Sequence, residues 1–198
     1  MPCQYSRPLV PCDSRNSWST LAVFLASLAL AGCTGLPKDV NRPVSVALIA
    51  PSNTALYRVV NAHQQAAKTK HTSGFALLSG PQAAYSSRLA LVEAAQKTLD
   101  LQYYAIHADT SSERLLRAVA AAARRGVRVR VLLDDLHTSG PDAQVMRLAF
   151  VPNIEMRMFN PLTGARGSAM GRMLGSVGDF SRVQQRMHNK LFVADNAM

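Results

Sequence analysis

Residues 81–159 alternate between two kinds of hydrophobic pattern, and this alternation limits the fold more than any other feature of the chain. Apolar residues recur at helical spacing in some segments, and β-branched and aromatic residues fill the segments between them. The expected helices span 81–98, 111–126 and 142–150, and the expected strands span 99–106, 127–135 and 153–159. Because parallel strands need crossover connections of about this length, the order predicts an α/β fold with a largely parallel sheet flanked by helices.

Local signals mark the ends of these elements. Ser111 or Ser112 is expected to cap the helix that ends before Gly126, a residue suited to the left-handed conformation that follows a helix. The stretch 160–180 holds five glycines and predicts a mobile loop. The sequence KLFVAD (190–195) then predicts a further strand.

Residues 1–32 have the pattern of a secretory leader. Arginines precede an apolar run, LAVFLASLAL, that is too short to cross a bilayer but has the length of the apolar part of a secretion signal. The run leads into LAGC, which resembles the lipobox of bacterial lipoproteins and ends at Cys33. The resemblance implies that Cys33 is lipidated and anchors an exported chain to a membrane facing the periplasm, with Thr34 indicating the outer membrane of a Gram-negative bacterium. The alternative is an ordinary export signal followed by a chance cysteine.

The remainder divides into a weakly patterned segment and a globular domain. Residues 33–73 predict a tether or linker, and residues 74–198 predict the domain. No disulfide is expected in the mature chain, because Cys3 and Cys12 fall in the leader. The net charge of +10 favours an anionic partner but does not distinguish phospholipid headgroups from nucleic acid.

The pattern His188-x-Lys190-x-x-x-x-Asp195 suits phosphate chemistry. On a strand, residues two apart project to the same face, so the imidazole and the ammonium are expected to meet one ligand. A ring nitrogen can attack phosphorus while the cation stabilises charge on the non-bridging oxygens. Asp195 would point to the other face of an unbroken strand and is expected to be an orienting or structural group. The alternative is a surface edge strand with two scattered cations.

The surrounding sequence carries a resemblance to a known family. AARRGVRVRVLLDD (122–135), followed by PNIEMRMFNP and RMHNKLFVADN, resembles the amino-terminal half of the phospholipase D superfamily, particularly its bacterial cardiolipin synthase-like branch. The likeness covers about residues 74–196. It implies one half of a bilobal fold, in which one such motif from each half meets at a pseudo-two-fold interface. One histidine then forms a covalent phosphohistidine, the other protonates the leaving alcohol, and no metal or other cofactor is needed.

Carried onto this chain, the resemblance makes His188 the nucleophile or its acid partner, Lys190 the phosphate clamp and Asp195 the supporting carboxylate. Family members continue beyond the aspartate with glycines, an asparagine and a second half bearing the second motif, whereas this sequence ends at Met198. The expected function is therefore a phosphatidyltransferase or phosphodiesterase similar to cardiolipin synthase, incomplete as this chain. Its partners would be a phospholipid, a membrane surface and a second motif-bearing half, supplied by a longer chain or by another subunit.

Two other functions stay open. Single-motif relatives include nucleases that build the site from two identical chains, although the missing residues after the motif and the lipoprotein leader make nucleic acid the less favoured substrate. The third is an inactive, truncated and membrane-anchored fragment.

Other polar residues have plainer explanations. Asp134 and Asp135 follow a strand as a metal pair could, but adjacent side chains point in different directions, which favours a loop or capping role. The loop of residues 107–109 could face the substrate. Four further histidines lack the spacing of metal ligands and are expected to be ordinary residues: His63, His71, His107 and His137.

Overall fold

The computed structural model describes residues 23, 36, 39–68, 73–164, 166–167, 170–172 and 180–198. The chain forms two compact units, residues 1–35 and 36–198, and the fold below is that of the second. The predicted leader (except Val23), its lipidation residue Cys33 and His71 lie outside the described residues.

A sheet of four strands forms the centre of the unit. β1 (Thr98–Tyr103), β2 (Arg128–Asp134), β3 (Ile154–Phe159) and β4 (Leu191–Ala194) lie in the order β3-β2-β1-β4. β2 pairs in parallel with both β1 and β3, whereas β4 runs antiparallel to β1. The predicted α/β fold with a largely parallel sheet is confirmed.

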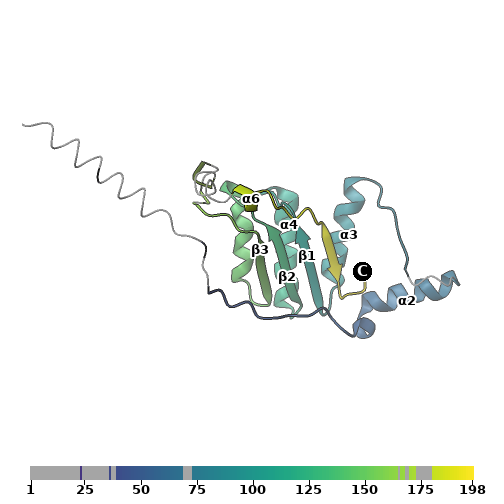
Figure 1. Cartoon of the computed structure of the whole chain (residues 1–198). Coiled ribbons are helices and arrows are strands. Elements are labelled where there is room, and N and C mark those ends of the chain that lie inside the picture. The colour runs from purple at the N-terminus through teal and green to yellow at the C-terminus, as the bar shows by residue number, and fades with distance from the viewer. Residues whose placement is uncertain are drawn as a thin grey trace, which may run out of the picture. The chain divides into compact units, whose positions relative to one another are not determined.

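Helices cover one face of this sheet. α3 (Gly80–Ala94), α4 (Thr110–Arg124) and the 3-10 helix η2 (Gly140–Phe150) lie together behind the strands in Figure 1. The helix-facing side chains of β2 are the alternate residues Val129, Val131 and Leu133, whose exposed fractions are 0, 2 and 0%. Burying each of them stabilises the fold by about 1.5–3 kcal/mol, and this apolar layer holds the sheet against the helices.

The ends of all three expected helices differ from the sequence-based expectation. The helix expected at 81–98 is α3, which ends at Ala94. The residue that caps α4 is Asp109, not Ser111 or Ser112, since its carboxylate accepts hydrogen bonds from the Ser112 N–H (2.8 Å) and the Ser111 hydroxyl (2.6 Å). Gly126 has the predicted left-handed conformation, with φ of 98°. The expected helix at 142–150 is a 3-10 helix that already begins at residue 140.

Residues before α3 also contain regular structure that the weak sequence pattern did not predict. η1 (Pro51–Asn53) is followed by α2 (Ala55–Ala67), which is capped by the buried Thr54. Only Leu56 of α2 is buried, so this helix adds little to the core. Whether residues 33–73 act as a tether stays a prediction.

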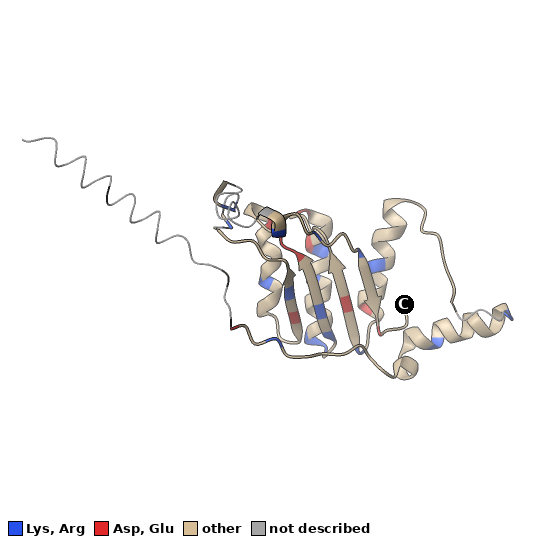
Figure 2. Cartoon of the chain, in the orientation of Figure 1, with Lys and Arg blue, Asp and Glu red and all other residues tan. Residues whose placement is uncertain are grey.

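The other face of the sheet carries charged side chains and an extended segment. Figure 2 shows acidic and basic residues on β2 and β3 and an acidic residue on β1. Arg128 donates to the Val46 carbonyl (2.7 Å) and Arg130 donates to the Ser45 carbonyl (3.2 Å), so the segment before η1 is hydrogen-bonded to β2. Arg130 also pairs with Asp100 of β1 at 2.5 Å. Among the helices of the described residues, none has the length and apolar content needed to cross a membrane.

Candidate active site

The direction of β4 determines where the predicted motif lies. Because β4 runs antiparallel to β1, its first residue, Leu191, pairs with Gln102 near the end of β1. Residues 188–190 therefore lie beyond the carboxyl end of β1, at the edge where the parallel strands β1 and β2 also end. The strand begins at Leu191, so His188 and Lys190 belong to an irregular segment before β4 and not to the strand itself.

His188 and Lys190 are both exposed, and their side chains meet at one aromatic ring. The ring of Tyr104, the first residue after β1, lies 4.5 Å from the His188 ring between centroids, with an angle of 36° between the planes. The Lys190 ammonium nitrogen is 5.7 Å from the centroid of the same ring and donates a hydrogen bond to the His188 carbonyl at 2.9 Å. The structure thus brings the imidazole and the ammonium together on the accessible edge of the sheet.

A buried carboxylate at the end of β2 holds the segment that leads to His188. Asp134 is fully buried and accepts hydrogen bonds from the Met187 N–H (2.8 Å) and from the Arg186 guanidinium (3.1 Å). Its Oδ1 atom also accepts from the Leu136 N–H at 2.9 Å. Since Met187 immediately precedes His188, the backbone on that side of the histidine is anchored to β2.

The neighbouring carboxylate anchors a different segment. Asp135, also fully buried, accepts from the Leu162 N–H (2.7 Å) and pairs with Arg166 (2.5 Å) and with Arg172 (2.9 Å). Burial alone would raise the pKa of Asp135, but the hydrogen bonds from Arg166, Thr138 and Leu162 outweigh it and lower the pKa. The two adjacent aspartates therefore join separate hydrogen-bond groups, in agreement with the loop-anchoring role that the sequence favoured. Asp135 organises the described part of the stretch 160–180, whose mobility stays a prediction.

Asp195 lies at the opposite end of β4 from His188. Its buried carboxylate accepts hydrogen bonds from the N–H groups of Gln96 (3.0 Å), Lys97 (2.7 Å) and Thr98 (3.0 Å). Its own N–H donates to the Thr98 carbonyl at 2.8 Å. Asp195 thereby anchors the turn that leads into β1. The structure brings His188 and Lys190 together but does not bring Asp195 to them.

Two more histidines lie next to the rings of His188 and Tyr104 along this edge. Together the rings of His188, Tyr104, His137 and His107 form a row, called the row of rings below. The His137 ring lies edge-on to Tyr104, with centroids 4.9 Å apart, and the His107 ring lies 6.1 Å from His137. His107 Nδ1 is 2.9 Å from a carboxylate oxygen of Asp142, and this hydrogen bond is the main reason that the pKa of Asp142 is lowered. The loop of residues 107–109 therefore lies near the candidate site, as the sequence suggested it could.

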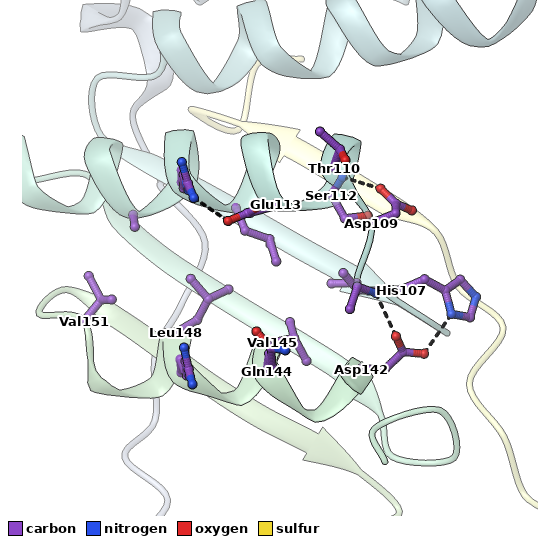
Figure 3. Close-up of a pocket in the computed structure, with 16 residues that line it drawn as sticks. His107, Asp109, Thr110, Ser112, Glu113, Asp142, Gln144, Val145, Leu148 and Val151 are labelled. Carbon is purple, nitrogen blue, oxygen red and sulfur yellow. Dashed lines mark hydrogen bonds and ion pairs between the residues drawn. The ribbon is translucent and has the colours of Figure 1, made fainter. Parts of the chain in front are cut away.

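A pocket of about 550 Å³ lies on the helix side of this loop. It lies between α4 and η2, and Figure 3 shows His107 and Asp142 at one end of it. Its floor includes Leu116, Val145 and Leu148, which belong to the apolar packing between the helices and the sheet. His107 therefore belongs both to the polar end of this pocket and to the row of rings.

The family of this chain follows from a sequence comparison. The family model for the cardiolipin synthase, phospholipase D-like domain matches residues 89–198, which is more than half of the chain. The chain belongs to this family. The match begins within α3 and contains all four strands, the motif residues and the row of rings.

Similar proteins contain this phospholipase D-like domain within longer chains. Cardiolipin synthase C of Escherichia coli is 46% identical over 115 residues, which make up 58% of this chain and 24% of that protein. An uncharacterized protein of Helicobacter pylori is 34% identical over 177 residues, covering 88% of this chain and 34% of the relative. This chain therefore spans about a quarter to a third of the length of these relatives.

Solved structures add no further information about function. The chain of NucT from Helicobacter pylori aligns with a TM-score of 0.40 and 17% identity, over 58% of this chain and 62% of that one.

Sequence reasoning missed the part that Tyr104 and His137 play in the site of this phospholipase D-like domain, and it did not connect Asp134 with the motif. The Tyr104 ring contacts the His188 ring, and the His137 ring contacts that of Tyr104. Asp134 accepts a hydrogen bond from the backbone N–H of Met187, the residue before His188. The sequence signals were present but ambiguous. An aspartate after a buried strand is a common turn residue, so its position in the sequence did not single it out.

Proposed function

We propose that this chain supplies one half of a phospholipase D-type active site that transfers or hydrolyses a phosphatidyl group. The observation that carries the proposal is the meeting of His188 and Lys190 on the ring of Tyr104, at the exposed carboxyl edge of the sheet. Membership of the cardiolipin synthase, phospholipase D-like domain family supports the same chemistry. The positive net charge suits a phospholipid with an anionic headgroup such as phosphatidylglycerol.

The reaction proceeds in two displacements. A ring nitrogen of His188 attacks phosphorus and forms an N–P bond while the P–O bond to the headgroup alcohol breaks. A general acid donates a proton to the departing alkoxide, and Lys190 stabilises the charge on the non-bridging oxygens. Water or a second alcohol then attacks the phosphohistidine, loses its proton to the same acid–base group and releases the histidine. Water yields phosphatidic acid, and phosphatidylglycerol as the acceptor yields cardiolipin.

The acid–base group must lie on the side of phosphorus opposite His188, because attack and departure occur in line. A single histidine does not reach both sides of one phosphorus. We therefore propose that the acid comes from a second motif-bearing half, either in a longer chain or in a second subunit. The relatives, of which this chain spans only about a quarter to a third, leave room for such a half.

Vesicles of phosphatidylglycerol test the proposal directly. The purified chain is incubated with them, and phosphatidic acid, cardiolipin and glycerol are measured by mass spectrometry. His188→Ala should abolish both lipid products, and Lys190→Ala should reduce them about 10²–10³-fold, the usual effect of removing one group that stabilises an oxyanion. The matched control is His63→Ala, an exposed histidine on α2, which should leave the products unchanged.

The protein concentration identifies where the second half comes from. If two copies share a site, the turnover per chain rises with concentration. If the unaltered chain is inactive at every concentration, the proposal fails for the chain alone. Cleavage of plasmid DNA without phosphatidylglycerol turnover would instead support the dimeric nuclease. Vesicle binding that is unaffected by His188→Ala, without any turnover, would support an inactive membrane-anchored fragment.

We further propose that the mature chain is an exported lipoprotein anchored through Cys33 in the outer membrane of a Gram-negative bacterium. The support is the apolar run that leads into LAGC. Cells fed labelled palmitate should incorporate the label into the chain, and Cys33→Ala should abolish it. Cys12→Ala, within the predicted leader, is the control and should retain the label.

A further inference from the structure

Two adjacent tyrosines at the end of β1, Tyr103 and Tyr104, point to opposite sides of the sheet. Tyr103, the last residue of the strand, packs against the apolar core beneath the helices. Because successive side chains of an extended chain alternate, Tyr104 points away from that core. Its ring is half-exposed and lies at the edge that bears the motif.

Three side chains of the site contact the ring of Tyr104. The centroid distance to the His188 ring, 4.5 Å, falls in the range of attractive aromatic pairs, and the angle of 36° between the planes makes this a tilted pair rather than an edge-on one. The Lys190 ammonium at 5.7 Å lies within the distance at which a cation is attracted to an aromatic face. His137 approaches from the edge at 4.9 Å.

His188 depends on this contact for its orientation. A reactive histidine is usually oriented by a hydrogen bond from one ring nitrogen to a carboxylate or a carbonyl. Within the part of the chain that the structure describes, the hydrogen bonds of residue 188 involve its backbone and not its ring, and the carboxylate of Asp195 is engaged at the far end of β4. The side chain is also exposed and lies outside regular structure, so the ring of Tyr104 is the contact that bears on its orientation.

We propose that Tyr104 is a positioning residue that holds the His188 imidazole and the Lys190 ammonium as one unit facing the phosphate. The ring restricts the imidazole to one plane and keeps the ammonium on the same side, so both groups reach one phosphorus together. When His188 carries the phosphatidyl group, its imidazole gains positive character, and the negative face of the tyrosine ring attracts it more strongly. The effect comes from the aromatic face and does not need the hydroxyl group. This inference rests on the proposed function for its catalytic consequence, but the placement of His188 can be tested without any turnover.

Nuclear magnetic resonance tests the placement. The ring protons of His188, assigned by their loss in His188→Ala, are shielded when they lie over the Tyr104 ring. Tyr104→Phe should leave their chemical shifts nearly unchanged, and Tyr104→Leu should move them downfield. Tyr57→Leu, which removes a half-buried tyrosine from α2, is the matched control and should move neither. Tyr104→Gln serves as a second ringless variant if Tyr104→Leu does not fold, as judged by circular dichroism.

Kinetics on phosphatidylglycerol in mixed micelles test the consequence. Tyr104→Leu should lower kcat on the order of tenfold to a hundredfold, the cost of misplacing a reacting group by about 1 Å, while KM changes little. Tyr104→Phe should restore most of the rate. Unchanged His188 shifts in both ringless variants would overturn the placement. A shift without any loss of kcat would overturn the positioning role. Absence of turnover in the unaltered chain would count against the proposed function and leave the placement to be decided by the resonance data.

Discussion

Replacing Asp134 with asparagine should destabilise the domain more than its small chemical change suggests. The carboxylate is fully buried, and both of its oxygens accept hydrogen bonds. Oδ1 accepts from the Leu136 N–H and the Arg186 guanidinium, and Oδ2 accepts from the Met187 N–H. An asparagine amide has only one acceptor atom, so in either orientation its NH2 group faces a donor.

The structure sets the size of this effect. A buried N–H that loses its acceptor costs about 1–3 kcal/mol. The Arg186 side chain is only 6% exposed, and leaving one partner of a buried ion pair without the other costs about 3–5 kcal/mol. Because the two effects share one site and are not additive, we expect Asp134→Asn to lower the free energy of unfolding by about 3–5 kcal/mol. That is a large part of the total stability of a typical domain, about 5–15 kcal/mol.

Urea unfolding followed by far-ultraviolet circular dichroism measures the difference. The matched control is Glu113→Gln on α4, which makes the same chemical change in an exposed pair with Arg117 and should cost less than about 1 kcal/mol. If Asp134→Asn is no more destabilising than Glu113→Gln, Asp134 does not anchor the segment before His188 and the argument built on its contacts is wrong.

Three further changes test other contacts. Asp195→Ala removes the acceptor of three N–H groups and places alanine at a φ of 52°, so the free energy of unfolding measured in urea should fall by about 2–4 kcal/mol. A fall of less than about 1 kcal/mol would contradict the anchoring role of Asp195. The pKa of Asp135 is lowered in the folded state, so its carboxylate stabilises the fold above the pKa of the unfolded chain, and this stabilisation is lost as the pH falls below about 4. The free energy of unfolding, measured across this pH range, should therefore change less with pH in Asp135→Asn than in the unaltered chain. The same pH dependence in both proteins would argue against the lowered pKa. Asp109→Ala removes the cap of α4 and should lower the melting temperature, whereas Ser112→Ala, which keeps the backbone N–H that donates to Asp109, should lower it less; equal melting temperatures for the two variants would contradict the capping role of Asp109.

Local periodicity was enough to predict the strands and most of the helices. The alternation of valine and arginine in 127–131 marks β2, because one face of that strand packs against helices and the other carries charged side chains. The same reasoning did not predict α2, although Leu56, Val59 and Val60 stand at helical spacing in its first turns. It also chose a serine as the cap of α4, because the four residues 109–112 are all polar and only the backbone geometry selects Asp109.

The site was only partly predictable for a related reason. The spacing of His188 and Lys190 identified them as a pair, although they precede the strand on which they were expected to lie. The same motif includes Asp195, yet the length of β4 separates it from the histidine. Asp134 supports the histidine from a neighbouring strand, and nothing in the local sequence distinguishes it from Asp135.

The sequence alone determined the order of helices and strands, the α/β class and the pairing of His188 with Lys190, for which we propose roles in attacking and holding a phosphate, because these depend on spacing along the chain. Only the tertiary structure decided that β4 runs antiparallel to β1, that Tyr104 meets the histidine and the lysine, and which buried carboxylate anchors which segment. The physical reason is that a buried carboxylate or an exposed ring interacts with whatever groups the folded chain brings within a few ångströms. Strand pairing chooses those groups from distant parts of the sequence.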